Sequence, residues 1–234
     1  MYGGIGAPAA LPLERVASLR TLSIDPSSRS RLGIVPSLAR HGGNVTGVSL
    51  GFTQELIGKY LELLQETVPR LSTVAVIYDA QNANNRKLAE HLTVVAPARR
   101  LKVWLIEMDS QNELDPTFKK VHQEAQAAVV LTNAFAIIHR HQITALAQRY
   151  RVPVIYSLSE YVDAGGLMAY GPEQAEMYRH AAEYVDKILK GAIAADLPIA
   201  EPTRFQLLLN LAAARALGLK IPESILLRAN KVIR

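Results

Sequence analysis

Polar side chains gather at the points where the expected β-strands end. They are Asp79, Asn82 and Asn84 after the run 73–78, Asn133 after 128–131, and Ser157, Ser159 and Glu160 after 153–156. Because parallel strands end at one edge of a sheet, these side chains are expected to lie close together. Amides and hydroxyls suit hydrogen bonding to a small polar ligand better than they suit bond breaking. The alternative, which the chemistry leaves equally open, is that they only terminate strands and cap helices.

A candidate nucleophile, Ser49, lies in the segment Gly47–Gly51, which matches the G-x-S-x-G pattern of serine hydrolases. That chemistry needs a buried strand that turns sharply into a helix, so that the serine oxygen faces an oxyanion hole. Residues 41–44 do not read as such a strand, and the next helix is expected to begin only near Thr53. We therefore expect no catalytic residue, and a hydrolase that uses Ser49 is the least favoured alternative.

Cofactor and metal motifs are equally weak. Residues 4–9 match G-x-G-x-x-A and Asp25 follows at a suitable spacing, but the dinucleotide fingerprint requires a strand that the short segment 1–3 cannot supply. The histidines are isolated or, for His139 and His141, point in different directions on a helix. The sequence therefore predicts no cofactor and no metal site.

The composition narrows the class of protein. Of the 234 residues, 49% are hydrophobic and 20% are charged, so a packed core is expected. The net charge of +5 comes from scattered basic residues, which argues against nucleic acid as a partner. No apolar run is long enough for membrane insertion, and the absence of cysteine excludes disulfides and thiolate chemistry. Residues 1–13 lack the basic start and unbroken apolar centre of a secretory signal peptide.

Short β-branched runs alternate with helical patterns through the middle of the chain. Strands are expected at 73–78, 101–106, 128–131 and 153–156, and helices at 84–98, 113–125 and 138–150. This alternation is typical of βαβ units and predicts an α/β fold with a doubly wound parallel sheet. The flanks add helices at 53–67 and 173–190 and strands at 22–24, 165–171 and 205–209. These pieces are too few for a second complete sheet.

Several segments carry a family resemblance. They are SLARHGGNVTGVS at 37–49, GKYLELL at 58–64, AGGLMAYGP at 164–172, YVDKILKG at 184–191 and ALGLKIP at 216–222. In this order they resemble the ABC transporter substrate-binding protein family that includes tryptophan- and tyrosine-type binders, whose members carry SLARPGGNVTGVS at the first segment. The likeness runs from near Gly6 to the C-terminus.

The resemblance implies a type I periplasmic binding protein-like fold, in which two lobes close on a ligand. Residues 1–49 and 165–202 would form a partial lobe one, and residues 50–164 and 203–234 would form lobe two with its complete sheet. The implied function is that of a non-enzymatic, periplasmic solute-binding component of an ABC importer, with a permease as its protein partner. Full-length members begin with a signal peptide and further βα units of lobe one, and we expect that part to be missing from this chain.

The ligand implied is a small polar molecule, with an amino acid as a candidate, held in the cleft between the lobes. Asp25 matches the family's Asp-Pro and would contact the ligand from lobe one. The remaining predicted contacts are Asn82, Asn133, Ser157, Glu160 and, near the hinge, Tyr170. Asn133 replaces the aspartate common in the family, which removes a charge that could pair with a ligand ammonium. A ligand-sensing module of a regulatory protein on the same fold is the second hypothesis, which a neighbouring kinase or DNA-binding segment would favour.

Overall fold

The computed structural model describes residues 21–24 and 45–234, and the chain divides into two compact units. Unit 1 comprises residues 1–51 and 172–204, and unit 2 comprises residues 52–171 and 205–234. Residues 165–171, which the sequence analysis grouped with 172–202, fall in unit 2 because β7 pairs within its sheet.

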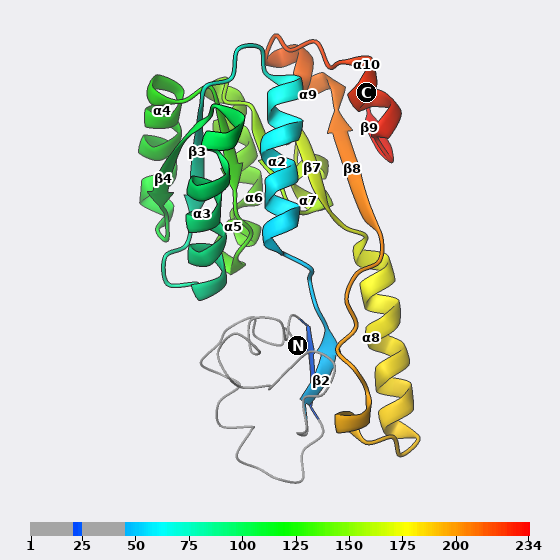
Figure 1. The fold of residues 1–234 in the computed structure, drawn as a ribbon. Helices are drawn as coiled ribbons and strands as arrows, with labels where there is room; N and C mark the ends of the chain where they lie inside the picture. The colour runs from blue at the N-terminus through cyan, green and yellow to red at the C-terminus, as the bar shows by residue number, and fades with distance from the viewer. Residues whose placement is uncertain (1–20, 25–44) are drawn as a thin grey trace. The chain divides into compact units, whose positions relative to one another are not determined.

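Unit 2 is built on a seven-stranded sheet in the order β4-β3-β5-β6-β7-β8-β9 (Figure 1). The strands are β3 (Thr73–Tyr78), β4 (Lys102–Glu107), β5 (Ala127–Val130), β6 (Val154–Tyr156), β7 (Met168–Pro172), β8 (Phe205–Asn210) and β9 (Lys231–Ile233). The pairs β3–β4, β3–β5, β5–β6, β6–β7 and β8–β9 are parallel. The predicted α/β fold with a mostly parallel sheet is confirmed.

The central strand β3 explains why its sequence is a continuous apolar run. Val74 and Val76 belong to one core cluster, whereas Ala75 and Ile77 belong to the other, so successive side chains alternate between the two faces. In a strand that is buried on both faces no side chain reaches solvent, so the sequence is apolar throughout. This pattern is typical of a parallel sheet covered by helices.

Helices cover both faces of this sheet, as Figure 1 shows. One cluster includes α2 (Gln54–Thr67), α3 (Ala83–Val95), α9 (Leu211–Ala216) and α10 (Glu223–Arg228); the other includes α4 (Leu114–Glu124), α5 (Ala134–Ile138), α6 (Arg140–Arg149) and α7 (Ser159–Asp163). The short 3-10 turns η3 (Pro97–Arg99) and η4 (Gln111–Glu113) border α3 and α4. The helix expected at 138–150 is observed as α6, and the short helix α5, which was not expected, precedes it because Asn133 caps α5 and His139 departs from helical geometry between the two.

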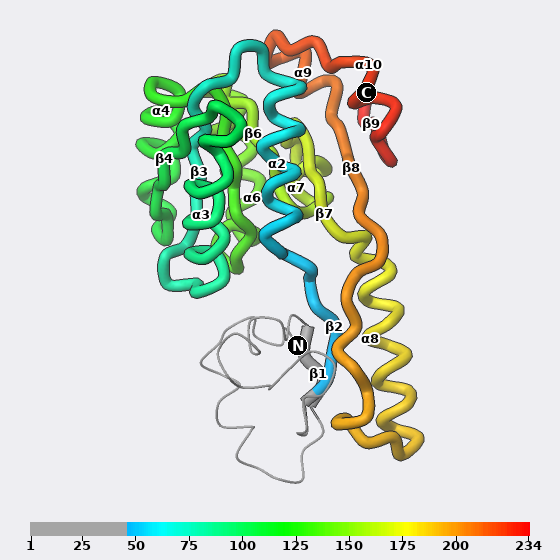
Figure 2. Tube along the Cα trace, in the orientation of Figure 1, coloured from blue at the N-terminus to red at the C-terminus, as the bar shows by residue number. Residues whose placement is uncertain are grey.

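Unit 1 has fewer described elements, and the tube in Figure 2 traces the chain through them. β1 (Thr21–Ile24) and β2 (Val45–Val48) form a parallel pair, and α8 (Gln174–Leu189) and the turn η5 (Ala194–Asp196) are the other described elements of the unit. Val48, Met177 and Ala181 form its described core cluster. The Thr46 hydroxyl donates to the carbonyl of Leu197 at 2.7 Å.

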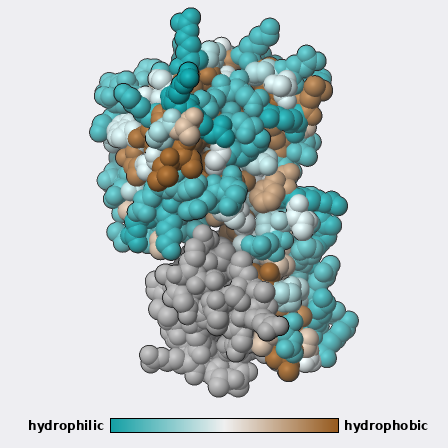
Figure 3. Space-filling view, viewed as in Figure 1, coloured by the Kyte–Doolittle hydropathy of each residue, from teal (hydrophilic) through white to brown (hydrophobic). Residues whose placement is uncertain are grey.

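The outer surface of unit 2 is mainly hydrophilic on the face drawn in Figure 3, with apolar residues gathered in a few places. None of the helices within residues 21–24 and 45–234 has the length and apolar character needed to cross a bilayer.

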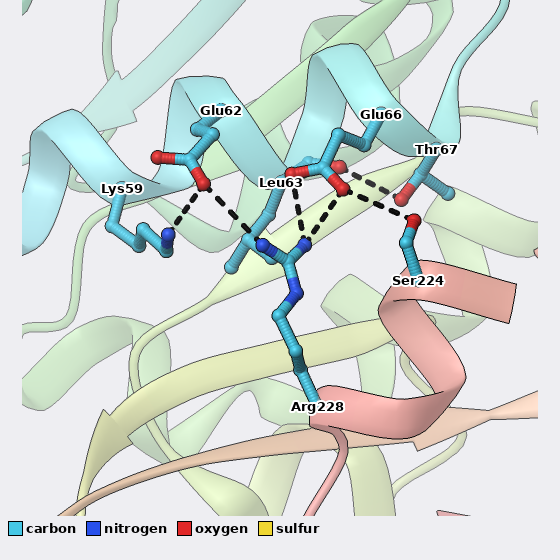
Figure 4. A network of polar contacts seen from close by, with 7 residues as sticks. All are labelled: Lys59, Glu62, Leu63, Glu66, Thr67, Ser224 and Arg228. Carbon is cyan, nitrogen blue, oxygen red and sulfur yellow. Dashed lines mark hydrogen bonds and ion pairs between the residues drawn. The ribbon is translucent and has the colours of Figure 1, made fainter. Parts of the chain in front are cut away.

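Near the C-terminus, α10 is fastened to α2 by an ion-pair network (Figure 4). The Arg228 guanidinium donates to both carboxylate oxygens of Glu66, at 2.8 and 2.7 Å, and approaches Glu62 at 3.4 Å. Lys59 donates to the same Glu62 carboxylate from the preceding turn of α2. One guanidinium nitrogen thus reaches both Glu66 oxygens, and this partly exposed ion pair adds to the apolar contacts of α10, whose Ile225 is fully buried in the core cluster.

Candidate ligand-binding site

The first loop at the carboxyl edge of the unit 2 sheet follows β3 and leads into α3. Asn82 is the N-cap of α3, and its side-chain oxygen accepts hydrogen bonds from the backbone N–H groups of Asn84 and Asn85, both at 3.0 Å. Asp79 accepts from the backbone N–H of Gln81 at 2.8 Å. The side-chain nitrogen of half-buried Asn82 has no partner among the described residues. Asn82 therefore caps a helix, and its side-chain donors are not engaged by any described residue.

The second loop, after β5, is joined to the first by amide hydrogen bonds. Asn133 is buried, and its side-chain oxygen caps α5 by accepting from the backbone N–H of Ala136 at 2.8 Å. Its side-chain nitrogen donates to the Asn85 oxygen at 3.4 Å, and the Asn85 nitrogen donates to the carbonyl of Thr132 at 3.0 Å. Both ends of the Asn133 amide are thus engaged within the protein, which is the capping role that the sequence analysis held open.

The third loop follows β6 and supplies Ser157 and Glu160. Ser157 is buried at the end of the strand, whereas Glu160 lies half-buried in the first turn of α7. The Glu160 carboxylate accepts from the Ser159 hydroxyl at 3.2 Å. No basic side chain among the described residues pairs with Glu160 at salt-bridge distance, so its negative charge is available to a cation.

A small pocket opens between these loops and the first turns of α2. Its lining is Phe52, Thr53, Leu56, Ile57, Tyr60, Asn85, Leu88, Leu131, Thr132 and Ser157. The hydroxyls of Tyr60 and Thr132 are buried and have no hydrogen-bond partner among the described residues. Burial raises the pKa of Tyr60, and Ser157 acts against this rise, although the two hydroxyls do not meet in hydrogen-bonding geometry. Buried polar atoms in native proteins usually have a hydrogen-bond partner, so this pocket has room for a ligand atom that supplies one.

Of the two remaining predicted residues the structure describes Tyr170, which does not line the pocket; among the predicted residues that it describes, only Ser157 does. Tyr170 is half-buried on β7, packs against the core cluster that contains Tyr60, and stacks on Phe205 with ring centroids 6.2 Å apart. Asp25 lies outside the described residues. The loops after β3, β5 and β6 thus share one edge of the sheet, and hydrogen bonds join the first two directly.

Tyr60, Thr132 and Asn85 are the site residues that the sequence analysis missed. Tyr60 lies at helical spacing from Leu56, Ile57 and Leu64, so the sequence predicts only that it belongs to the apolar face of α2. The available signal was its phenol, since a buried tyrosine hydroxyl normally needs a partner. Asn85 and Thr132 adjoin predicted strand ends but carried no distinguishing pattern.

Ser49 is not placed for nucleophilic catalysis. The expectation that no strand precedes it is wrong, because β2 ends at Val48. However, α2 begins only at Gln54, and the Ser49 hydroxyl accepts from the backbone N–H of Gly51 at 3.1 Å. The serine is buried and caps a local turn. Within the described ranges no group of three acidic, histidine or cysteine side chains converges as a metal site would require.

Comparison with known proteins identifies related chains. Residues 26–233 match the family model described as ABC transporter substrate binding protein. A protein named tyrosine-binding protein from Clostridioides difficile is 23% identical over 188 residues, which are 80% of this chain and 54% of that protein. The chain therefore spans about half the length of this curated relative.

Solved structures extend the comparison. The ABC domain in complex with L-Trp from Streptococcus pneumoniae superposes with a TM-score of 0.81 at 26% identity, covering 97% of this chain and 78% of that one. A conserved domain protein from Vibrio cholerae also has a TM-score of 0.81, at 21% identity, covering 96% and 83% of the two chains. The fold is that of type I periplasmic binding proteins.

Proposed function

Because the chain belongs to the ABC transporter substrate-binding protein family, we propose that it binds a small polar ligand, specifically an amino acid, for import. The family consists of non-enzymatic binding proteins, and the relatives named above include one named for tyrosine and one solved with L-Trp. An ABC permease is the proposed protein partner and the periplasm the proposed location.

The observation that carries the proposal is the carboxyl edge of the unit 2 sheet. Three loops at this edge carry amide and carboxylate groups, and a pocket beside them contains buried hydroxyls without partners. Ligands of open α/β sheets bind outside the carboxyl ends of the strands. The amide, hydroxyl and carboxylate groups of this edge suit the binding of a small polar ligand.

Each predicted residue receives a role that its surroundings allow. The Glu160 carboxylate, which has no basic partner among the described residues, would hold the ligand ammonium. The amide nitrogen of Asn82, which no described residue engages, would donate to the ligand carboxylate. Asn133 would position the second loop, because its amide is already engaged. Ser157 and Tyr170 would border the ligand, and Asp25 would add a contact from the other lobe.

Isothermal titration of the purified chain with the twenty amino acids tests the proposal. We expect saturable binding of at least one amino acid, and Glu160→Gln to weaken it about tenfold or more, since a charge-assisted hydrogen bond contributes roughly 1.5–3 kcal/mol. Glu113→Gln, an exposed carboxylate in η4, is the matched control and should leave the affinity unchanged. A folded chain that binds none of the amino acids would contradict the proposal.

A further inference from the structure

Besides the Thr53 hydroxyl, the lining of the pocket beneath the first turns of α2 has three hydroxyls and an apolar wall. Tyr60 is 1% exposed, and its hydroxyl and that of Thr132 are buried without partners among the described residues. Ser157, 4% exposed, brings a third hydroxyl to the same lining. The wall between them is formed by aliphatic side chains such as Leu56 and Leu131.

The other polar groups of the lining are already engaged. The Asn85 amide donates to the Thr132 carbonyl and accepts from Asn133, and the Thr53 hydroxyl accepts from the backbone N–H of Leu56. The start of α2 is also occupied, since Glu55 is held by its own backbone N–H, which lowers the pKa of its carboxyl. The polar groups that remain for a ligand are therefore hydroxyls, each of which can donate and accept. The Thr132 hydroxyl also acts against the rise that burial causes in the pKa of Tyr161, although these two hydroxyls do not meet in hydrogen-bonding geometry.

Charge and size restrict what the pocket can take. No acidic, basic or histidine side chain belongs to the lining, and a charged group without a counter-charge would lose its hydration there. The phenol of Tyr60 stays neutral because burial raises its pKa. The free space is that of about one water molecule, so only the end of a ligand fits.

We infer that this pocket is a subsite for an uncharged, hydroxyl-sized group at the end of the ligand's side chain, held by Tyr60 and Thr132. The inference rests on the proposed function, because the ligand's ammonium and carboxylate remain at the three loops outside the pocket. Ligands whose side chains carry a hydroxyl or amide are selected over charged or purely apolar ones. The pocket thereby sets specificity, whereas the loops hold the groups common to all amino acids.

Another buried hydroxyl provides a matched control. The Tyr156 hydroxyl is likewise buried without a partner among the described residues, but Tyr156 does not line the pocket and stacks on Tyr161 with ring centroids 4.5 Å apart. Tyr156→Phe removes a buried phenol oxygen, as Tyr60→Phe does, but from a residue of unit 2 that does not line the pocket. A general effect of losing a buried hydroxyl would therefore appear in both variants.

The test is titration calorimetry with amino acids that differ by one group: L-tyrosine and L-phenylalanine, L-threonine and L-valine, L-serine and L-alanine, L-glutamine and L-glutamate. The wild-type chain should prefer the uncharged polar member of the pair it binds by at least about tenfold, because the other member leaves the buried hydroxyls without a hydrogen-bond partner. Tyr60→Phe and Thr132→Val should each reduce that preference at least threefold, whereas Tyr156→Phe should retain it. Thermal unfolding of each variant verifies that it folds.

The outcomes separate the two proposals. A wild-type chain that binds no amino acid overturns the proposed function. If it binds but favours charged or purely apolar side chains, the subsite is wrong and the proposed function stands. Unchanged preference in folded Tyr60→Phe and Thr132→Val, or an equal loss in Tyr156→Phe, also overturns the subsite.

Discussion

The two units bury apolar surface in different ways. In unit 2 the seven-stranded sheet is covered on both faces, and fully buried side chains such as Phe118 and Leu61 fill two large clusters. In the described part of unit 1 the cluster is formed by Val48, Met177 and Ala181. The outer face of α8 meanwhile exposes Tyr178, Val185 and Leu189.

This contrast teaches where the stability of the described chain resides. Hydrophobic stabilisation scales with the apolar area removed from water, so the sheet of unit 2 contributes the larger share. The candidate ligand-binding edge belongs to that sheet, so the same buried core supports it. The following predictions test the contrast, from the largest expected effect to the smallest.

The first compares the core of unit 2 with the outer face of α8. Phe118→Ala should lower the free energy of unfolding by about 3–5 kcal/mol, because it leaves a cavity in a fully buried cluster. Leu189→Ala removes an 81% exposed side chain and should change it by less than about 0.5 kcal/mol. Urea denaturation followed by circular dichroism measures the free energy of unfolding of both variants. Equal losses in the two would contradict the contrast between the units.

The second concerns two glycines of unit 2. A Cβ on Gly171 would lie 1.9 Å from the backbone oxygen of Ser157, so Gly171→Ala should destabilise the unit by about 1–3 kcal/mol or more. At Gly58, inside α2, a Cβ meets nothing within 4 Å, and Gly58→Ala should add about 0.5–1 kcal/mol. Thermal unfolding should therefore shift in opposite directions, and a shift in the same direction would refute the packing described at Ser157.

The third addresses the amide link between the loops after β3 and β5. Asn133→Ala removes the cap of α5 and the hydrogen bond to Asn85, and should cost about 1–2 kcal/mol of unfolding free energy. Asn112→Ala, at an exposed position in η4, is the control and should be neutral within about 0.5 kcal/mol. Chemical denaturation compares the two, and a neutral Asn133→Ala would mean that this link does not hold the edge together.

The fourth and smallest effect concerns the network on α2. The hydrogen bond from Lys59, helped by the nearby Arg228 charge, lowers the pKa of Glu62 below its ordinary value. A carboxyl with a lowered folded-state pKa stabilises the protein above its unfolded pKa, and that stability is lost as the pH falls through the folded value. Glu62→Gln should therefore be slightly less stable than wild type at pH 7 and converge with it below about pH 4. A difference that persists unchanged at low pH would contradict this linkage.

Much of unit 2 could be predicted from sequence because its signals are local. The β-branched runs around Val76 and Val129 and the cap at Thr53 each determine an element with little tertiary help. The short helix α5 was not predicted, since only the folded structure shows that the Asn133 side chain caps it. Tyr60 was missed for a similar reason: helical spacing predicts that a side chain is buried but not that its hydroxyl lacks a partner.

The central claim is that an amino acid binds at the carboxyl edge of the unit 2 sheet. Hydrogen–deuterium exchange of the chain with and without the amino acid that titrates best tests this most directly. We predict slower exchange in the loops 79–85, 131–134 and 157–160, with no change at the opposite edge, where Ser72 and Thr73 donate to Gln126. Protection that appears only at that opposite edge, or binding without protection of any of the three loops, would contradict the account.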